Sequence, residues 1–329
     1  MEREPILTIQ NLKVSFTTSS GSFQVLRGIS YDLKEGEIHS LVGESGSGKT
    51  VTSTCILGLL PSPSGHIDSG TITYRGKDIT TLRGEALRLL RGKEIAMVFQ
   101  EPSRYLNPAF RIGEQITEML ILHQDLKKTE AEEKTRDLLA QVGLGEKKDV
   151  FAKYPHELSG GMKQRAMIAM AISCGPSVLI ADEPTTALDV TLQLQILHLI
   201  LKLKKDFGMG VLFISHDLGV VYSISDRVSV IYAGRIVESA SRDVLFSSPL
   251  HPYTRMLLLS IPDARRRGHR LKVIPGRVPE PRDIPPGCPF HPRCPQAEEL
   301  CKVTTPETRS YGNGHSAACH FTEKPWNDS

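Results

Sequence analysis

The sequence predicts an α/β protein with a mainly parallel β-sheet, a helical insertion in its middle and a small loop-rich module after about residue 262. Three observations carry this prediction. Short apolar segments typical of strands alternate with helical segments, which is the pattern of an α/β sheet. Between about residues 105 and 175 the pattern is helical. After about residue 262 proline becomes frequent and the hydrophobic periodicity is lost, which indicates a linker and loops.

The expected strands follow one another at regular intervals. They are predicted at 6–16, 38–42, 71–74, 95–99, 177–181, 211–214, 228–232 and 235–238. The segment 177–181 is almost entirely apolar, as expected for a parallel strand that is covered on both faces. Ala233 and Gly234 predict a hairpin turn between the last two strands.

The expected helices have recognisable ends. Helices are predicted at 50–60, which Pro61 ends, and at 191–207. Within the helical insertion, Thr129 followed by Glu132 predicts a capping box at the start of a helix. Gly143 predicts the end of that helix.

Composition bounds the possible functions. Of the 329 residues 40% are hydrophobic and 23% are charged, which is ordinary for a folded protein. The formal net charge of +3 gives no reason to expect a nucleic-acid partner. No apolar run approaches the roughly 20 residues that span a bilayer, and the first residues lack the pattern of a secretion signal. We therefore expect a cytosolic protein whose membrane role, if it has one, requires other chains.

A phosphate-binding loop is predicted between the second strand and the helix after it. Residues 43–50 read Gly-Glu-Ser-Gly-Ser-Gly-Lys-Thr and fit the pattern G-x-x-x-x-G-K-[ST]. Glycines allow backbone N–H groups to turn toward phosphate oxygens, and the following helix directs its positive end at the same anion. Lys49 is expected to reach the β- and γ-phosphates of a nucleotide, and Thr50 to bind Mg²⁺. The nucleotide-binding candidates here are Gly43, Ser45, Gly46, Gly48, Lys49 and Thr50.

Two carboxylates follow the apolar strand at 177–181. Asp182 has the position of a carboxylate that holds Mg²⁺, and Glu183 that of a general base that polarises an attacking water. Taken alone, this pair could equally be an acidic turn at the end of a strand. Together with the phosphate loop, it predicts nucleotide hydrolysis.

A second anion site is predicted at the start of a helix in the insertion. Leu158-Ser159-Gly160-Gly161 places a serine N-cap before two glycines, which leaves several backbone N–H groups free at a helix N-terminus. A helix cap without further function is the alternative interpretation.

With these motifs in this order, the chain resembles the ATP-binding-cassette ATPases. In that family the serine–glycine loop faces the γ-phosphate that the partner subunit's phosphate loop holds. The resemblance implies that Gln100 touches Mg²⁺ and the attacking water, that Asp189 belongs to the D-loop, and that His216 lies at the γ-phosphate. Phe16 is the aromatic residue expected to stack on adenine, with Phe23 as its rival. Met162 is a departure, since the family often has glutamine there.

The resemblance also implies a fold and a division into domains. It is that of a P-loop NTPase, with a RecA-like core, an antiparallel β subdomain and an α-helical subdomain at about 105–175. Residues 1–262 would form the nucleotide-binding domain and residues 263–329 a C-terminal cysteine-containing extension. Five basic residues between them predict a solvated linker, with contact to anionic lipid headgroups as the alternative. They are Arg265, Arg266, Arg267, Arg270 and Lys272.

Two further segments resemble oligopeptide and dipeptide permease ATPases. These are His251-Pro-Tyr-Thr-Arg-Met, after the cassette, and Glu101-Pro-Ser-Arg-Tyr-Leu-Asn-Pro, after Gln100, in which Glu101 and Tyr105 depart from the usual pattern. The resemblance implies a peripheral ATPase on the cytoplasmic side of the inner membrane, powering peptide uptake. Its partners would be an identical or homologous second ATPase, two membrane-spanning permease subunits and, indirectly, an extracytoplasmic peptide-binding protein. A non-peptide cargo such as nickel, and a cassette ATPase outside transport, are the alternatives.

The C-terminal region contains four closely grouped cysteines, Cys288, Cys294, Cys301 and Cys319. Four thiolates suit a [4Fe–4S] cluster or a zinc ion. Zinc sites usually contain tight C-x₂₋₄-C pairs, which are absent here, so the spacing and the family resemblance favour iron–sulfur. Zinc, or cysteines without a metal, are the alternatives, and His291, His315 or His320 could replace a ligand. Cys55 and Cys174 lie in apolar contexts and are expected to be buried and inert.

Overall fold

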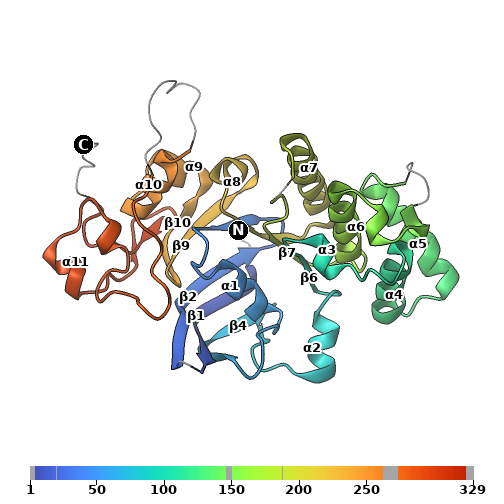
Figure 1. Ribbon diagram of the computed structural model, residues 1–329, viewed down its shortest axis with the longest axis horizontal. Helices are drawn as coiled ribbons and strands as arrows, with labels where there is room; N and C mark the ends of the chain where they lie inside the picture. The colour runs from blue at the N-terminus through green and yellow to red at the C-terminus, as the bar shows by residue number, and fades with distance from the viewer. Residues whose placement is uncertain (1–3, 20, 146–149, 187, 262–272, 324–329) are drawn as a thin grey trace. The chain divides into compact units, whose positions relative to one another are not determined.

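The structure is a computed structural model that describes residues 4–19, 21–145, 150–186, 188–261 and 273–323 (Figure 1). The basic run at 265–272 and Ala187 lie outside the described residues. The chain forms two compact units. The first comprises residues 1–7, 33–37 and 74–214, and the second comprises residues 8–32, 38–73 and 215–329. The predicted boundary at 262/263 stays a prediction.

The first unit contains parallel strands. β6 (Ile95–Val98) pairs with β7 (Val178–Asp182), which pairs with β8 (Gly210–Ser215). Every residue of β6 and β7 is buried, as the apolar sequence of a covered parallel strand requires. The other elements of this unit are β5 (Lys77–Asp78), α2 (Gly84–Leu90), α3 (Pro102–Tyr105), η1 (Val150–Ala152), η2 (Pro155–Glu157) and α7 (Val190–Phe207).

The predicted helical insertion also belongs to the first unit. It is made of α4 (Ile112–Gln124), α5 (Lys128–Gln141) and α6 (Gly160–Ile172), which pack against one another. The capping box predicted at Thr129 is wrong, because α5 begins one residue before it, at Lys128, and the extended residue before the helix is Lys127. The predicted helix end is confirmed, since Gly143 has a φ of 79° directly after α5.

The second unit contains β3, the strand that precedes the phosphate loop, and the strands that pair next to it. β3 (Ile38–Val42) runs parallel to β9 (Arg227–Tyr232), and β9 pairs antiparallel with β10 (Arg235–Ser241). Ala233 and Gly234 both have positive φ, which confirms the predicted hairpin turn. Beyond β10 lie β12 (Ser316–Ala317) and β11 (Arg309–Ser310) from the C-terminal region. Its helices are α1 (Lys49–Ile56), α8 (Leu218–Ile224), α9 (Arg242–Ser247), α10 (Pro252–Leu259), η4 (His291–Arg293) and α11 (Glu299–Val303).

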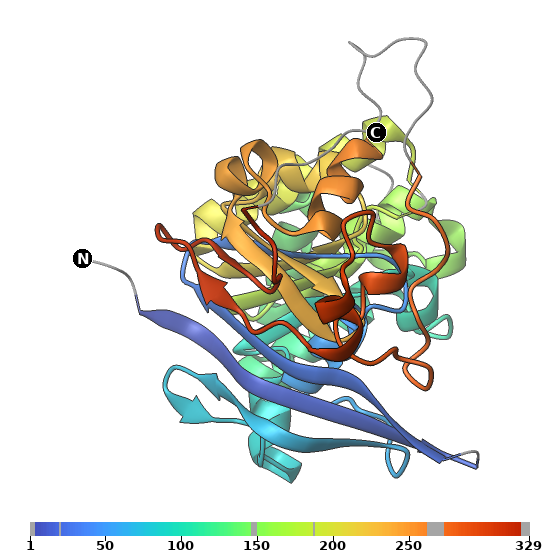
Figure 2. The same cartoon turned by 90° about the vertical axis from the view of Figure 1, so that its left-hand side faces the viewer.

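A second sheet contains long strands from the first quarter of the chain. β1 (Pro5–Thr18) lies between β2 (Gly21–Lys34) and β4 (Gly65–Tyr74), side by side in Figure 2. The sequence analysis did not predict β2, because its buried residues are interrupted by polar and half-buried ones.

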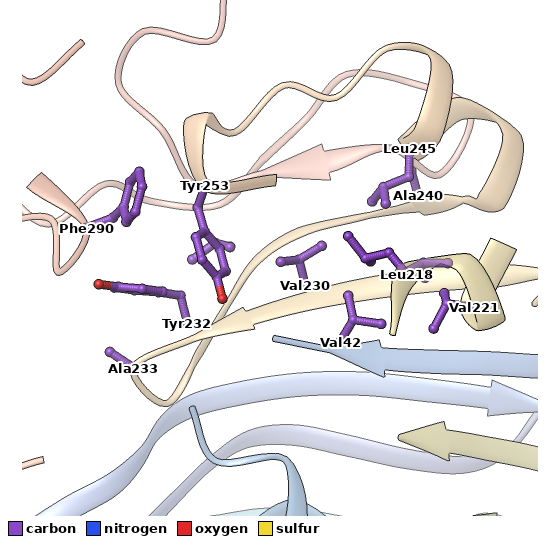
Figure 3. Close-up of a cluster of buried hydrophobic side chains, with 12 residues drawn as sticks. Val42, Leu218, Val221, Val230, Tyr232, Ala233, Ala240, Leu245, Tyr253 and Phe290 are labelled. Carbon is purple, nitrogen blue, oxygen red and sulfur yellow. The ribbon is translucent and has the colours of Figure 1, made fainter. Parts of the chain in front are cut away.

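The C-terminal region joins the hydrophobic core of the second unit. In Figure 3, Phe290 lies beside Tyr232 of β9 and Tyr253 of α10, at one end of a cluster whose other end holds Val42 and Leu218. Phe290 is 1% exposed and Tyr253 is 0% exposed. The extension is therefore built onto the hydrophobic core that supports the strand before the phosphate loop.

Candidate active site

The phosphate loop connects β3 to α1 and needs glycine at two positions for reasons of space. A Cβ at Gly43 would lie 2.3 Å from the Ile231 carbonyl oxygen, and one at Gly48 would lie 2.7 Å from Leu26 Cδ2. Gly48 also has a φ of 109°, a left-handed conformation that other residues rarely adopt. The loop is thus packed against its neighbours and turns sharply into α1.

Lys49 closes this loop. Its Nζ donates hydrogen bonds to the carbonyl oxygens of Gly43, at 2.8 Å, and Glu44, at 3.1 Å. Lys49 is 6% exposed, whereas Ser45, Gly46 and Thr50 are exposed. A buried ammonium beside exposed loop residues and a helix N-terminus is an arrangement suited to a polyphosphate.

Of the two carboxylates, Asp182 is the last residue of β7 in the first unit, and Glu183 follows it. Asp182 is 4% exposed, and Glu183 has a φ of 46°, a strained conformation for a residue with a side chain. Gln100 Nε2 donates to Glu183 Oε2 at 2.9 Å, and Thr186 Oγ1 donates to the same oxygen at 3.0 Å. These donors hold the carboxylate in one orientation. The structure brings Gln100 and Glu183 together, and it adds Thr186, which the sequence analysis missed although it lies three residues after Glu183.

The segment after Gln100 presents aromatic side chains at the surface. Tyr105 is 50% exposed and stacks on Phe99 with ring centroids 3.8 Å apart, and Phe110 is 53% exposed. Glu101 pairs with Arg104, with Oε2 and Nε 2.7 Å apart. The two departures from the permease pattern, Glu101 and Tyr105, therefore both contribute to an exposed surface next to Gln100.

The serine–glycine loop begins α6 as predicted. Ser159 Oγ accepts a hydrogen bond from the Met162 N–H at 3.4 Å, which confirms the predicted N-cap, and Met162 is half-buried. A Cβ at Gly160 would meet nothing within 4 Å, whereas one at Gly161 would lie 3.1 Å from Leu192. Asp189 caps the next helix, α7, by accepting from the Leu192 N–H at 2.9 Å. Leu192 thus links two predicted site segments.

The remaining nucleotide-site candidates belong to the second unit. His216 follows β8 and is exposed. Phe16 and Phe23 form one stacked pair, with ring centroids 6.4 Å apart and an interplanar angle of 19°. The Arg282 guanidinium lies 4.8 Å from the centre of the Phe23 ring. The two rivals for the adenine site are therefore neighbours, and an arginine of the extension borders them.

The four C-terminal cysteines line one small cavity together with His251 and His320. Burial raises the pKa of Cys288 to about 11 and that of Cys294 to about 12. Among the described residues, no group of three or more His, Cys, Asp or Glu is arranged to hold a single metal ion.

The three histidines considered as substitute ligands form hydrogen bonds of their own. His315 Nε2 lies 2.8 Å from Glu238 Oε1, His320 Nε2 lies 2.9 Å from the Thr304 oxygen, and His291 Nδ1 lies 3.0 Å from the Cys288 oxygen. Cys55 and Cys174 are buried, as predicted, and burial raises the pKa of Cys55 to about 12. The ligand set predicted from the sequence stays a prediction.

Membrane-spanning segments are absent from the part of the chain that the structure describes, since none of its helices is both long and apolar enough to cross a bilayer.

Comparison with known proteins identifies the family. A model described as "ABC transporter" matches residues 26–186, and one described as "Oligopeptide/dipeptide transporter, C-terminal region" matches residues 237–301. The oligopeptide transport ATP-binding protein AppD of Bacillus subtilis is 46% identical over 97% of both chains. The chain belongs to the ABC transporter ATP-binding subunits. The dipeptide transport ATP-binding protein DppD of Escherichia coli is another such relative, 42% identical over 96% of both chains.

Solved structures agree with this membership. The cassette MJ0796, solved as a dimer, is similar with a TM-score of 0.64 and 26% identity, over 72% of this chain and 98% of that chain. The cbiO1 protein of Clostridium perfringens has a TM-score of 0.63 and 27% identity, over 74% and 92% of the two chains. These similarities confirm the predicted P-loop NTPase fold. This ABC subunit is an ATPase.

Proposed function

We propose that this ABC ATPase powers the uptake of dipeptides or oligopeptides across the cytoplasmic membrane. Relatives that match nearly the whole chain are named as oligopeptide or dipeptide transport proteins. The peptide-transporter C-terminal model also matches, so the likeness extends beyond the cassette that all ABC ATPases share. This match over the extension is the observation that favours a peptide over another cargo.

We assign the hydrolytic roles from the sequence motifs. Lys49 would bind the β- and γ-phosphates, and Phe16 would stack on adenine. Thr50, Asp182 and Gln100 would hold Mg²⁺, which would supply positive charge to neutralise the phosphate oxygens. Glu183, oriented by Gln100 and Thr186, accepts the proton of the attacking water, and His216 contacts the γ-phosphate. The oriented Glu183 carboxylate carries the case for hydrolysis, because a general base must be held in place.

A partner subunit completes the site in this proposal. Ser159 of the partner subunit and Gly161 of the partner subunit bind the γ-phosphate held by Lys49. The open space around Gly160 supports this, since the loop has room for a ligand. MJ0796 was solved as a dimer in a state bound to ADP and phosphate, which supports pairing of cassettes. The partner is an identical or homologous ATPase.

Membrane subunits form the second kind of partner. We place their docking site on the exposed aromatic surface of Tyr105 and Phe110, beside Gln100. Exposed aromatic residues are typical of protein interfaces. The chain then works as a peripheral subunit on the cytoplasmic side of the membrane, with two permease subunits and, through them, an extracytoplasmic peptide-binding protein.

Transport by the complete complex tests the proposal. The complex should be purified from native membranes, its chains identified, and radiolabelled dipeptide or oligopeptide uptake measured in vesicles. We expect two permease chains and ATP-dependent uptake that Lys49→Ala abolishes, while the exposed-site control Lys302→Ala transports normally. A complex that hydrolyses ATP but carries no peptide would contradict the peptide assignment and leave the ATPase assignment intact.

For the cysteine cavity we propose a [4Fe–4S] cluster. The supporting observation is that all four thiols line one cavity. The described residues contain no group of three or more His, Cys, Asp or Glu arranged for a metal ion, and this finding favours neither zinc nor a cluster. The preference for a cluster rests on the absence of tight C-x₂₋₄-C pairs, which zinc sites usually contain. Iron and sulfide analysis of anaerobically purified protein tests this, and zinc alone, or no metal, would contradict it.

A further inference from the structure

Glu44, the second residue of the phosphate loop, is held by three side chains. Its carboxylate accepts two hydrogen bonds from Arg293, at 2.8 Å between Nη1 and Oε2 and 3.0 Å between Nη2 and Oε1. Its backbone N–H donates to Tyr253 Oη at 2.9 Å, and its carbonyl accepts from Lys49 at 3.1 Å. Two of these partners, Arg293 and Tyr253, come from the C-terminal part of the chain. The start of the phosphate loop is therefore anchored to that part.

Arg293 is held in a fixed position. It is 8% exposed, its Nε donates to the Pro275 carbonyl at 2.7 Å, and its Nη1 donates to Tyr232 Oη at 3.3 Å. Burial alone would lower the pKa of Arg293, but the hydrogen bonds to Glu44 and Tyr232 raise it above its usual value. The guanidinium is thus a permanent positive charge, and a bidentate pair with a carboxylate fixes it in both distance and direction.

An aromatic cluster supports the same contact. Tyr253 lies with its ring centroid 4.7 Å from that of Tyr232 and 5.3 Å from that of Phe290. Figure 3 shows the three side chains next to one another. Burial raises the pKa of Tyr253, so its hydroxyl stays neutral and can accept from the Glu44 N–H. Packed aromatic rings allow little movement, so the hydroxyl has a defined position.

A carboxylate in a phosphate loop poses an electrostatic problem. The triphosphate of ATP and the Glu44 carboxylate are both negative, and like charges in a partly buried site repel. Arg293 is the cation in direct contact with that carboxylate, in a geometry that neutralises it. Removing Arg293 would leave a half-buried negative charge at the start of the loop without its cationic partner.

We propose that Arg293 is a positioning residue for ATP: it neutralises Glu44 and fixes the start of the phosphate loop, so that the C-terminal extension sets the affinity of this ATPase for nucleotide. The proposal rests on the proposed function only in that the loop binds ATP. Arg293 is the last residue of η4 and directly precedes Cys294. It therefore lies between Cys288 and Cys294, two of the four grouped cysteines. Arg293 thus connects the phosphate loop to the residue next to one of the four grouped cysteines.

The test is a double-mutant cycle in the full-length protein, in which each charge is removed singly and then both are removed together. Arg293→Met, Glu44→Gln and the double variant should be compared for ATP dissociation constant, KM and kcat, with Lys302→Met as control. Lys302 lies in the same region and pairs with Glu299, but both are exposed. We expect Arg293→Met to weaken ATP binding about tenfold, the effect of one partly screened charge pair, and to raise KM more than it lowers kcat.

The double variant separates electrostatics from mere structural support. Without the Glu44 charge, Arg293→Met should cost little, so the double variant should recover most of the lost affinity. Glu44→Gln alone should bind ATP at least as tightly as the native protein, because the positive charge remains and the negative one is gone. If Arg293→Met fails to fold, Glu44→Gln still decides the question, and Arg293→Lys, which keeps the charge but loses the bidentate pair, should weaken ATP binding by less than about tenfold.

Three results would overturn the proposal. These are unchanged ATP affinity in Arg293→Met, no recovery in the double variant, or weakened binding in Glu44→Gln. Failure of the proposed function would look different, since Lys49→Ala would then leave ATP hydrolysis intact whatever Arg293 does.

Discussion

The phosphate loop and the N-terminus of α6 are both glycine-containing segments that begin a helix, yet they differ in how firmly they are held. In the loop, Gly43 and Gly48 touch neighbouring strands, and Lys49 bonds to two carbonyls. At α6, one 3.4 Å hydrogen bond caps the helix and Gly160 has open space around it. The phosphate loop is thus fixed by contacts within its own chain, whereas the open space at Gly160 is compatible with the proposed contact to a partner subunit's nucleotide.

The largest effect is expected on kcat when the Glu183 carboxylate is removed, because this change should stop hydrolysis without stopping ATP binding. Glu183→Gln should lower kcat by about 10²–10⁴-fold, because a positioned general base is lost, while ATP still binds. Lys49→Ala should instead lose ATP binding itself. Single-turnover hydrolysis and equilibrium nucleotide titration on the same preparations measure the two. Equal loss of binding in both variants would contradict the division of roles.

The different packing around Gly48 and Gly160 can be measured as the change in the free energy of unfolding when each is replaced by alanine. Gly48→Ala should lower the free energy of unfolding by about 1–3 kcal/mol, because its left-handed backbone and the nearby Leu26 oppose a side chain. Gly160→Ala should change it by less than about 0.5 kcal/mol, the usual range for an uncrowded surface position. Denaturant unfolding of both variants gives the comparison. Equal losses would show that the α6 segment is as tightly packed as the loop.

A smaller effect on kcat is expected at Thr186, which the sequence did not predict as a site residue. Thr186→Val keeps the side-chain shape but removes the hydroxyl that donates to Glu183, so kcat should fall about tenfold, the usual value of one hydrogen bond to a charged group. KM for ATP should not change, because the hydroxyl orients the base and does not bind nucleotide. Steady-state kinetics decide this, and a raised KM with an unchanged kcat would refute it.

The smallest effect concerns the junction between β10 and the C-terminal region. Burial alone would raise the pKa of Glu238, but hydrogen bonds from His315 and from the N–H groups of Leu250 and His251 lower it below its usual value. A carboxyl with a lowered folded pKa stabilises the protein above the unfolded pKa, about 4.3 for Glu, and loses this contribution as the pH falls through the folded pKa.

Glu238→Gln should therefore lower the free energy of unfolding by about 1 kcal/mol at pH 7, and the difference from the native protein should shrink below about pH 4. Unfolding curves at pH 7, 5 and 3.5 measure this. The exposed carboxylate variant Glu299→Gln is the matched control and should show no such pH dependence. A difference that grows toward low pH would have the wrong sign and exclude the assignment.

The sequence predicted those parts of the fold that depend on neighbours along the chain. Apolar runs predicted β3 and β7, and the glycine pattern predicted the phosphate loop. The Thr129 capping box failed, because a Thr-x-x-Glu pattern does not determine which residue leaves the extended conformation first. The strand β2 was missed, because its mixed burial resembles neither a covered nor a half-exposed strand.

The candidate site divides in the same way. Gln100 and Glu183 were identified as site residues from short motifs, although no motif shows that they share a hydrogen bond. The pair of Arg293 and Glu44 could not be predicted, since its members lie 249 residues apart in sequence and belong to no shared pattern. Contacts of that kind are determined by tertiary packing, such as the Tyr232–Tyr253–Phe290 cluster that supports this one.

The two-residue strand β12 has a practical consequence for anyone who shortens this protein. It pairs with β10 through Glu238 and Ser239. Truncation of the chain after residue 261 would therefore expose β10 as an edge strand, and would also expose one side of Tyr253. Exposed edge strands pair with other chains and promote aggregation. A trimmed cassette would therefore be expected to precipitate, and low solubility of such a fragment should not be mistaken for a defect in the cassette itself.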